Sequence, residues 1–166
     1  MVPAIAIIVS RYNASITDAL VEGARAEFNA RYPGSTALAV YDAPGTYELP
    51  VLALAAAETG RYRGAPAPGR LIRGETPPDR YIARPGSHGP MQGALPTGVP
   101  VAFGVLTVES PKQARARAGG EKGNKGREAM AAVLETLLSA DAIRRGAPPE
   151  HTPDRTVLPD KAGAQA

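Results

Sequence analysis

Residues 4–28 read AIAIIVSRYNASITDALVEGARAEF, a continuous apolar run followed by an amphipathic repeat, and this stretch decides the fold. The run Ala4–Val9 is rich in Ile and Val, which is typical of a parallel strand buried on both faces. Ser15, with Asp18 three residues later, predicts a helix start. One apolar helix face follows, made of residues four positions apart: Ile16, Leu20, Ala24 and Phe28. A buried strand that leads into a helix is the opening unit of an α/β fold.

The same alternation continues along the chain. Strands are predicted at 36–41 and 99–105, and a helix at 48–59. A further helix starts at Ser110-Pro111, a glycine-rich loop follows over 119–126, and a final helix has its apolar face between 129 and 138. Strands that alternate with helices predict a parallel sheet covered on both faces, and such sheets bind ligands at the carboxyl ends of their strands.

The segment 63–97 interrupts this pattern with seven prolines and six glycines. The alternation asks for a strand at about 65–72 and a helix at about 79–95. Proline removes ladder donors from a strand and costs a helix interior about 3 kcal/mol, so periodicity alone predicts a loop here. Residues 147–166 hold four prolines without any periodic pattern, and we expect a disordered tail. The predicted domain is therefore 1–146.

Composition excludes several classes of protein. The chain has no cysteine, so disulfides and thiolate metal sites are absent, and neither of its two histidines has a metal-ligand neighbour at useful spacing. Basic residues form no run longer than two and aromatic residues are sparse, so we expect no nucleic-acid partner. No stretch approaches the roughly 20 apolar residues of a membrane span. We expect a cytoplasmic protein that uses no metal.

Three loops at the expected carboxyl edge carry candidate binding residues, each with a plainer alternative. Tyr12 follows the first strand and could stack on a flat heterocycle, or it is a surface tyrosine. Thr46-Tyr47-Glu48 could hydrogen-bond a polyol, or it caps the next helix. Gly74-Glu75-Thr76 could hold a phosphate at a helix start, or it is a capped turn. Beyond these loops, Arg117 and Lys125 could pair with an anion, or they are solvated charges.

Six motifs in this chain resemble, in order and spacing, the 6,7-dimethyl-8-ribityllumazine synthase family over roughly residues 4–143. They are IVSRYN at 8–13, ITDAL at 16–20, PGTYELP at 44–50, IRGETP at 72–77, VPVAFGVLT at 99–107 and RAGGEKGNKG at 117–126. The resemblance implies a flavodoxin-like three-layer α/β/α sandwich with a four-stranded parallel sheet. It implies a transferase of riboflavin biosynthesis that condenses 5-amino-6-(D-ribitylamino)uracil with 3,4-dihydroxy-2-butanone 4-phosphate, without any cofactor.

The resemblance also implies how the substrates are held. Tyr12 matches the aromatic residue that stacks on the pyrimidine, and Thr46-Tyr47-Glu48 matches the segment that holds the ribityl chain and ring. Leu71 and Ile72 match residues that line the ring pocket, and Gly74-Glu75-Thr76 matches the phosphate segment. Further residues match positions near the ring, the phosphate and the ribityl chain in a site that two subunits share: Phe103, Arg117 and Lys125.

The family forms homopentamers, and in many members twelve of them build a 60-subunit shell. Only three residues precede Ala4, where shell-forming members have an extra strand, so we expect a pentamer. The main departure is Pro78, which occupies the position of the family's catalytic histidine and cannot relay a proton. A non-catalytic ligand-binding or scaffold assembly is therefore an alternative to the enzyme. A flavodoxin-like FMN binder is another, although Ser10–Ser15 is a poor phosphate loop.

Overall fold

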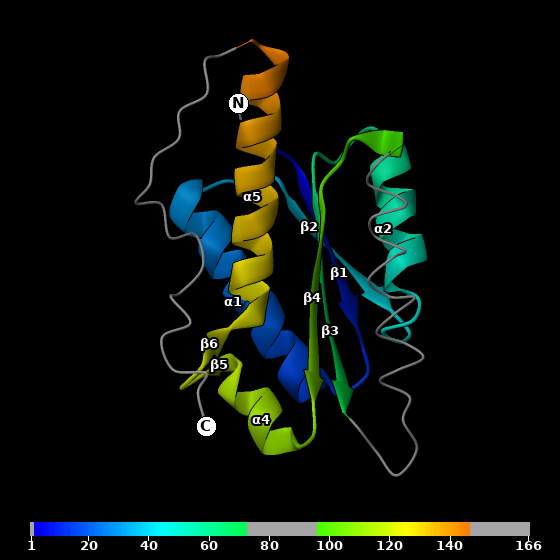
Figure 1. The fold of residues 1–166 in the computed structure, drawn as a ribbon, viewed down its shortest axis with the longest axis vertical. Helices are drawn as coiled ribbons and strands as arrows, with labels where there is room; N and C mark the ends of the chain where they lie inside the picture. The colour runs from blue at the N-terminus through cyan, green and yellow to red at the C-terminus, as the bar shows by residue number, and fades with distance from the viewer. Residues whose placement is uncertain (1, 73–95, 147–166) are drawn as a thin grey trace.

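The computed structural model describes residues 2–72 and 96–146 of the chain, apart from the side chain of Ile72. Strands and helices alternate in these ranges, as the sequence predicts (Figure 1). The elements in chain order are β1 (Ile5–Ser10), α1 (Ala14–Arg31), β2 (Leu38–Ala43), α2 (Leu49–Glu58), β3 (Ala65–Ile72), β4 (Val101–Val108), α4 (Pro111–Ala116), β5 (Ala118–Gly120), β6 (Gly123–Asn124) and α5 (Lys125–Arg144). The helix predicted at 79–95 and the tail predicted at 147–166 lie outside the described residues.

Three layers form around β1, which is buried along its whole length. Successive side chains of a strand point to opposite faces, and here the two faces meet different helices. Ile5, Ile7 and Val9 pack with α1 and α5, whereas Ala6 and Ile8 pack with α2. Figure 1 shows α1 and α5 on one side of the strands and α2 on the other. The α/β class and the strand buried on both faces are therefore confirmed.

The strands are joined as two parallel pairs rather than as one continuous ladder. In one pair β1 runs beside β2, and in the other β3 runs beside β4. The two pairs meet at a single parallel bridge between Ile5 and Gly64. A four-stranded hydrogen-bonded sheet is thus not confirmed, although β1 and β3 share one apolar cluster.

Two prolines explain why the ladder between β1 and β3 stops. The N–H of Ala65 donates to Pro100 on the β4 side (3.0 Å), whereas the carbonyl of Gly64 accepts from Ala6 on the β1 side (3.1 Å). Backbone groups alternate sides along a strand, so the nitrogen atoms of Pro66 and Pro68 are directed toward β1, where neither carries a hydrogen to donate. The β3–β4 ladder keeps all eight register pairs because it needs neither donor.

Three local predictions need correction. Periodicity predicts a loop over 63–97, which is wrong for Ala65–Ile72 because these residues form β3. The predicted loop over 119–126 instead contains the short β5–β6 hairpin and the first turn of α5. Helix α1 starts one residue before Ser15, after Asn13 in a left-handed conformation (φ 65°), and no side chain caps it. A different predicted start is confirmed, since the Ser110 hydroxyl accepts from the N–H of Gln113 at the beginning of α4.

Candidate active site

The carboxyl ends of the strands gather at one edge of the molecule. Figure 1 shows the tips of β3 and β4 at the same end as α4 and the β5–β6 hairpin. Parallel pairing also brings the ends of β1 and β2 together, where Ser10 lies opposite Ala43. The described loops that follow β1 and β2 contain four of the predicted site residues, Tyr12, Thr46, Tyr47 and Glu48, and ligands of parallel sheets bind at such edges.

The loop between β2 and α2 is anchored to the end of β3. Thr46 is buried, and its hydroxyl donates to the carbonyl oxygen of Arg70 at 3.2 Å. Gly69 makes room for this contact, because a Cβ there would lie 3.2 Å from the Thr46 hydroxyl oxygen and 3.0 Å from Leu49. The alternative that Thr46 caps α2 is wrong, since Glu48 occupies the N-cap position and makes no side-chain cap.

The loops after β1 and β2 present exposed aromatic side chains. Tyr12, directly after β1, is 72% exposed, and Tyr47 is 61% exposed. Glu48 is half-buried, and its carboxylate folds back over Gly45, where a Cβ would lie 2.8 Å from Oε2. The two rings, open to solvent, can stack on a flat ring, and the Glu48 carboxylate can accept hydrogen bonds from a polyol.

Three further predicted residues lie within β3 and β4. Leu71 is buried near the end of β3, and Ile72 is the last residue of that strand. Phe103 on β4 is half-buried, lies opposite Ala67, and belongs by strand alternation to the α2 face, as do Val101 and Val105. The remaining predicted residues lie outside the described ranges: Gly74, Glu75, Thr76 and Pro78.

The predicted anion-binding residues sit together, in a different part of the same end. The carbonyl oxygen of Arg117 accepts from the N–H of Lys125 at 2.9 Å. The Arg117 guanidinium donates to the Gln113 carbonyl at 3.3 Å, and Lys125 forms an ion pair with Glu128. All of these partners belong to α4 or α5. Within a single subunit, Arg117 and Lys125 are therefore hydrogen-bonded to each other. In the described ranges, neither residue forms a hydrogen bond to the loop that contains Thr46.

Sequence reasoning missed one charged residue at this edge. Arg70, on β3, is only 6% exposed, and its Nε is buried without a hydrogen-bond partner. Burial lowers the pKa of its guanidinium, and the positive charge of Arg115 lowers that pKa further. The signal in the sequence was an arginine within an otherwise uncharged strand, but burial without a counter-charge is visible only in the fold.

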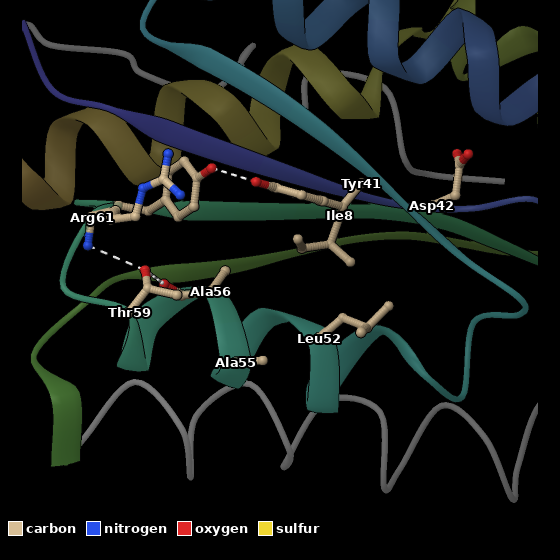
Figure 2. A pocket seen from close by; sticks show the side chains of 9 residues that line it. Ile8, Tyr41, Asp42, Leu52, Ala55, Ala56, Thr59 and Arg61 are labelled. Atoms are coloured by element: carbon tan, nitrogen blue, oxygen red, sulfur yellow. Dashed lines mark hydrogen bonds between the residues drawn. The ribbon is translucent and has the colours of Figure 1, made fainter.

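A separate cavity of about 290 Å³ opens between β2 and α2 (Figure 2). Ile8, Leu52 and Ala56 form apolar walls, and the hydroxyls of Tyr41 and Tyr62 hydrogen-bond to each other at one side. None of the predicted site residues in the described ranges lines it. In the same ranges, no cluster of acidic or histidine side chains could hold a metal ion, and no helix is long and apolar enough to cross a membrane.

The sequence profile of the family described as 6,7-dimethyl-8-ribityllumazine synthase matches residues 3–140. The chain belongs to this family. Its similarity to 6,7-dimethyl-8-ribityllumazine synthase 1 of Caulobacter vibrioides is 43% identity over 145 residues, or 87% of this chain and 95% of that protein.

Two further lumazine synthases show the same degree of similarity. The protein of Deinococcus deserti is 45% identical over 132 residues, or 80% of this chain and 85% of its own length. That of Xanthomonas oryzae pv. oryzae is 46% identical over 132 residues, or 80% and 86%. The family resemblance expected from six short motifs is confirmed. Membership in the lumazine synthase family also supports the flavodoxin-like arrangement of the described strands and helices.

Proposed function

We propose that this chain is a cytoplasmic lumazine synthase, which joins 5-amino-6-(D-ribitylamino)uracil to 3,4-dihydroxy-2-butanone 4-phosphate and releases phosphate and water. The match to the family over residues 3–140 carries this proposal. The geometry supports it, because the buried Thr46 fixes the β2–α2 loop, which exposes Tyr47, against β3. The N–H of Arg11, next to the exposed Tyr12, donates to the carbonyl oxygen of Ala43 at the end of β2 at 2.9 Å.

The roles proposed for the side chains follow from their chemistry. The rings of Tyr12 and Tyr47 offer flat faces to the pyrimidine, and Glu48 accepts hydrogen bonds from ribityl hydroxyls. The Arg117 guanidinium pairs with the phosphate that leaves, since its planar fork matches two phosphate oxygens. The 5-amino group of the pyrimidine attacks the ketone carbonyl, and one water leaves as the imine forms. Phosphate is then eliminated, and the ribitylamino nitrogen closes the ring on the remaining carbonyl carbon with loss of a second water.

Pro78 makes reduced activity part of the proposal. A positioned acid–base group contributes about 10²–10⁴-fold to a rate, and a proline at the position of the family histidine supplies none. Holding two reactants in the right orientation contributes more than that in favourable cases, and this contribution needs no proton relay. We therefore expect slow but measurable turnover, carried by substrate positioning.

We also propose a homopentamer whose sites are shared between neighbours, with a 60-subunit shell as the larger alternative. In the described residues, Arg117 and Lys125 bond only to groups around α4 and α5, whereas Tyr47 and Glu48 lie directly before α2 and Tyr12 lies directly after β1. A neighbouring subunit could bring the two groups together. Sedimentation should give a mass five times that of the chain. A monomer that turns over both substrates would contradict the shared site.

The experiment that tests the function compares turnover of both substrates by the purified protein and by Pro78→His. We expect weak turnover by the original chain and recovery of at least about tenfold in P78H. Normal turnover by the original chain would contradict the proton-relay role assigned to position 78. An Arg117→Ala change in the P78H background serves as the control, and it should lose most of the recovered rate.

The second candidate function is a scaffold or ligand-binding assembly without turnover, which Pro78 favours. Binding of the ribitylaminouracil, measured by calorimetry, separates the two functions. If P78H stays inactive while the pyrimidine still binds and the assembly persists, the scaffold is the correct function. The sequence retains the residues proposed to bind the pyrimidine as well as those proposed to bind the phosphate. This argues for the enzyme, since a scaffold needs neither set.

A further inference from the structure

Arg70 lies on the face of β3 that meets α1 and α5. On this strand, a Cβ at Gly64 would meet Val133 and Leu137 of α5, whereas one at Gly69 would meet Leu49 of α2. Side chains alternate between faces, so Arg70 shares the face of Gly64. Its register partner, Leu106, belongs to an apolar cluster on that face. A guanidinium among apolar groups is costly unless something balances its charge.

The described residues provide no such balance. Arg70 makes no ion pair there and no side-chain hydrogen bond, and its Nε is both buried and unpartnered. The charged group that acts on it is Arg115 of α4, which has the same sign. Arg115 is exposed and likewise has no ion-pair partner in the described ranges. Ala114, next to Arg115, packs in the same apolar cluster as Leu106, the register partner of Arg70. Two guanidinium groups therefore approach each other near the carboxyl edge of β3, and among the described residues no carboxylate pairs with either of them.

We propose that Arg70 and Arg115 form a binding site for a dianionic phosphate group, separate from the phosphate position assigned to Arg117. Guanidinium groups bind phosphate oxygens in pairs through parallel N–H donors. Arg70, buried and held in a strand, fixes one side of the anion, while the exposed Arg115 closes the site from α4. Inorganic phosphate and the phosphate of a small monoester share this chemistry, and both are candidate ligands.

The charge balance makes the anion a stabilising ligand of the folded chain. An anion that binds only the folded state raises its stability with concentration. The bound anion also reduces the repulsion between Arg70 and Arg115. Binding should therefore raise the melting temperature of the protein. This site does not depend on turnover, so its test is independent of the proposed reaction.

The test measures the melting temperature against phosphate concentration in the Arg117→Ala variant, in which the other phosphate position has lost its guanidinium. Sodium chloride keeps the ionic strength constant, so a general salt effect is removed. We expect inorganic phosphate to raise the melting temperature of R117A by a few degrees. Adding Arg70→Met, of similar bulk but uncharged, should abolish this rise. Adding Arg115→Ala instead should weaken the apparent phosphate affinity about tenfold.

The R70M change carries its own folding control. Without phosphate, we expect R70M to melt at or above the temperature of its parent, because an unpaired buried charge has been removed. If R70M does not fold, the exposed R115A variant decides the question alone. A phosphate-dependent rise in folded R70M/R117A as large as that in R117A would overturn the proposal, and so would the absence of any rise in R117A.

Glycerol 3-phosphate in the same assay separates the two sources of the phosphate group. A rise with glycerol 3-phosphate equal to that with inorganic phosphate, lost in R70M/R117A, assigns the site to phosphate monoesters as well. A rise with inorganic phosphate alone assigns it to the free ion. A rise with glycerol 3-phosphate that R70M leaves intact would contradict the site, since it would show that the ester binds elsewhere.

Discussion

Asn124 connects helix α5 to helix α1. Its side-chain amide donates to the carbonyl oxygen of Ala19 at 2.8 Å, while its Oδ1 accepts from the N–H groups of Gly126 and Arg127 at 2.9 and 3.1 Å. One side chain thus caps the N-terminus of α5 and bonds to the backbone of α1. Because Lys125 and Arg117 flank this contact, Asn124 also sets the position of the predicted anion-binding residues.

Replacing Asn124 with alanine should lower the free energy of unfolding by about 1–2 kcal/mol, because the cap of α5 is lost. Asn124→Asp is the matched control, since a carboxylate still caps the helix but cannot donate to Ala19. We expect N124D to lose less stability than N124A. Urea unfolding followed by circular dichroism measures both. Equal stability of N124A and the parent would show that the cap contributes nothing here.

Gly126 is the position where the two helices leave no room for a side chain. A Cβ there would lie 1.9 Å from the carbonyl oxygen of Leu20, a backbone atom that cannot rotate away. Gly126→Ala must therefore push α5 from α1, and we expect a loss of about 1–3 kcal/mol or more.

The control for Gly126 is Gly34→Ala, where φ is +74° and nothing lies within 4 Å of a new Cβ. Its cost should be the conformational one alone, about 1–2 kcal/mol. Thermal unfolding compares the two variants. If G34A costs as much as G126A, the close approach of the helices is not what requires glycine at position 126.

Thr46→Val should disturb the site without a large loss of fold. The variant keeps the shape of the side chain but leaves the Arg70 carbonyl without its donor, at a cost of about 1–3 kcal/mol. The β2–α2 loop should then hold Tyr47 and Glu48 less firmly. We expect weaker binding of the ribitylaminouracil by calorimetry, and Thr46→Ser should retain most of the affinity. Unchanged affinity in T46V would contradict the anchoring role.

The stability contributed by Asp141 should depend on pH. Burial by itself raises the pKa of this carboxyl, but hydrogen bonds and charge from Arg63 (2.7 Å) and Arg144 (3.3 Å) outweigh it and leave the pKa below its ordinary value of 3.8. A lowered folded-state pKa contributes stability above the unfolded pKa, and this is lost as the pH falls through the folded pKa.

Asp141→Asn should therefore be less stable than the parent at pH 7, and the difference should shrink below pH 3.8. Urea unfolding at a series of pH values measures it. Asp18→Asn, on the exposed side of α1, controls for the loss of one surface charge. A difference between D141N and the parent that persists unchanged into strong acid would show that the ion pairs are not its source.

Pro66→Val and Pro68→Val should add donors between β1 and β3. Each change supplies an N–H directed toward β1, and a hydrogen bond contributes about 0.5–1.5 kcal/mol. Proline restricts the unfolded chain, so replacing it lowers the free energy of unfolding by about 0.4–1 kcal/mol, which offsets part of this gain. The clearer readout is hydrogen exchange, where the new amides should be protected. Pro33→Ala, in the turn after α1, is the control, and its amide should exchange fast.

Local patterns predicted the elements whose signals are contained in a few consecutive residues. The Ile/Val run gave β1, and the spacing of Ile16, Leu20 and Phe28 gave the buried face of α1. The start of α1 could not be predicted in the same way, because Asn13 adopts its left-handed conformation without any side-chain cap. A capping pattern identifies a side chain that could bond, not one that does.

The harder features depend on residues far apart in the chain. A proline weakens a strand only if its nitrogen is directed at a neighbour, and that direction depends on the register with β1 and β4. The bond from Thr46 to Arg70 and the meeting of Arg70 with Arg115 both require the packed sheet. For the site, the family motifs predicted which residues would be used, while the described fold showed that they fall into two groups.

The prolines of β3 also affect how two copies of this chain could exchange parts by domain swapping. Few backbone hydrogen bonds hold β1 against β3, so a local opening between the two strand pairs breaks few hydrogen bonds and is opposed mainly by the apolar cluster that the two strands share. Each opened pair would then present an unpaired parallel edge that fits the complementary pair of another molecule equally well. At high concentration, exchange of halves between copies should therefore begin at this line, and P66V or P68V should slow it.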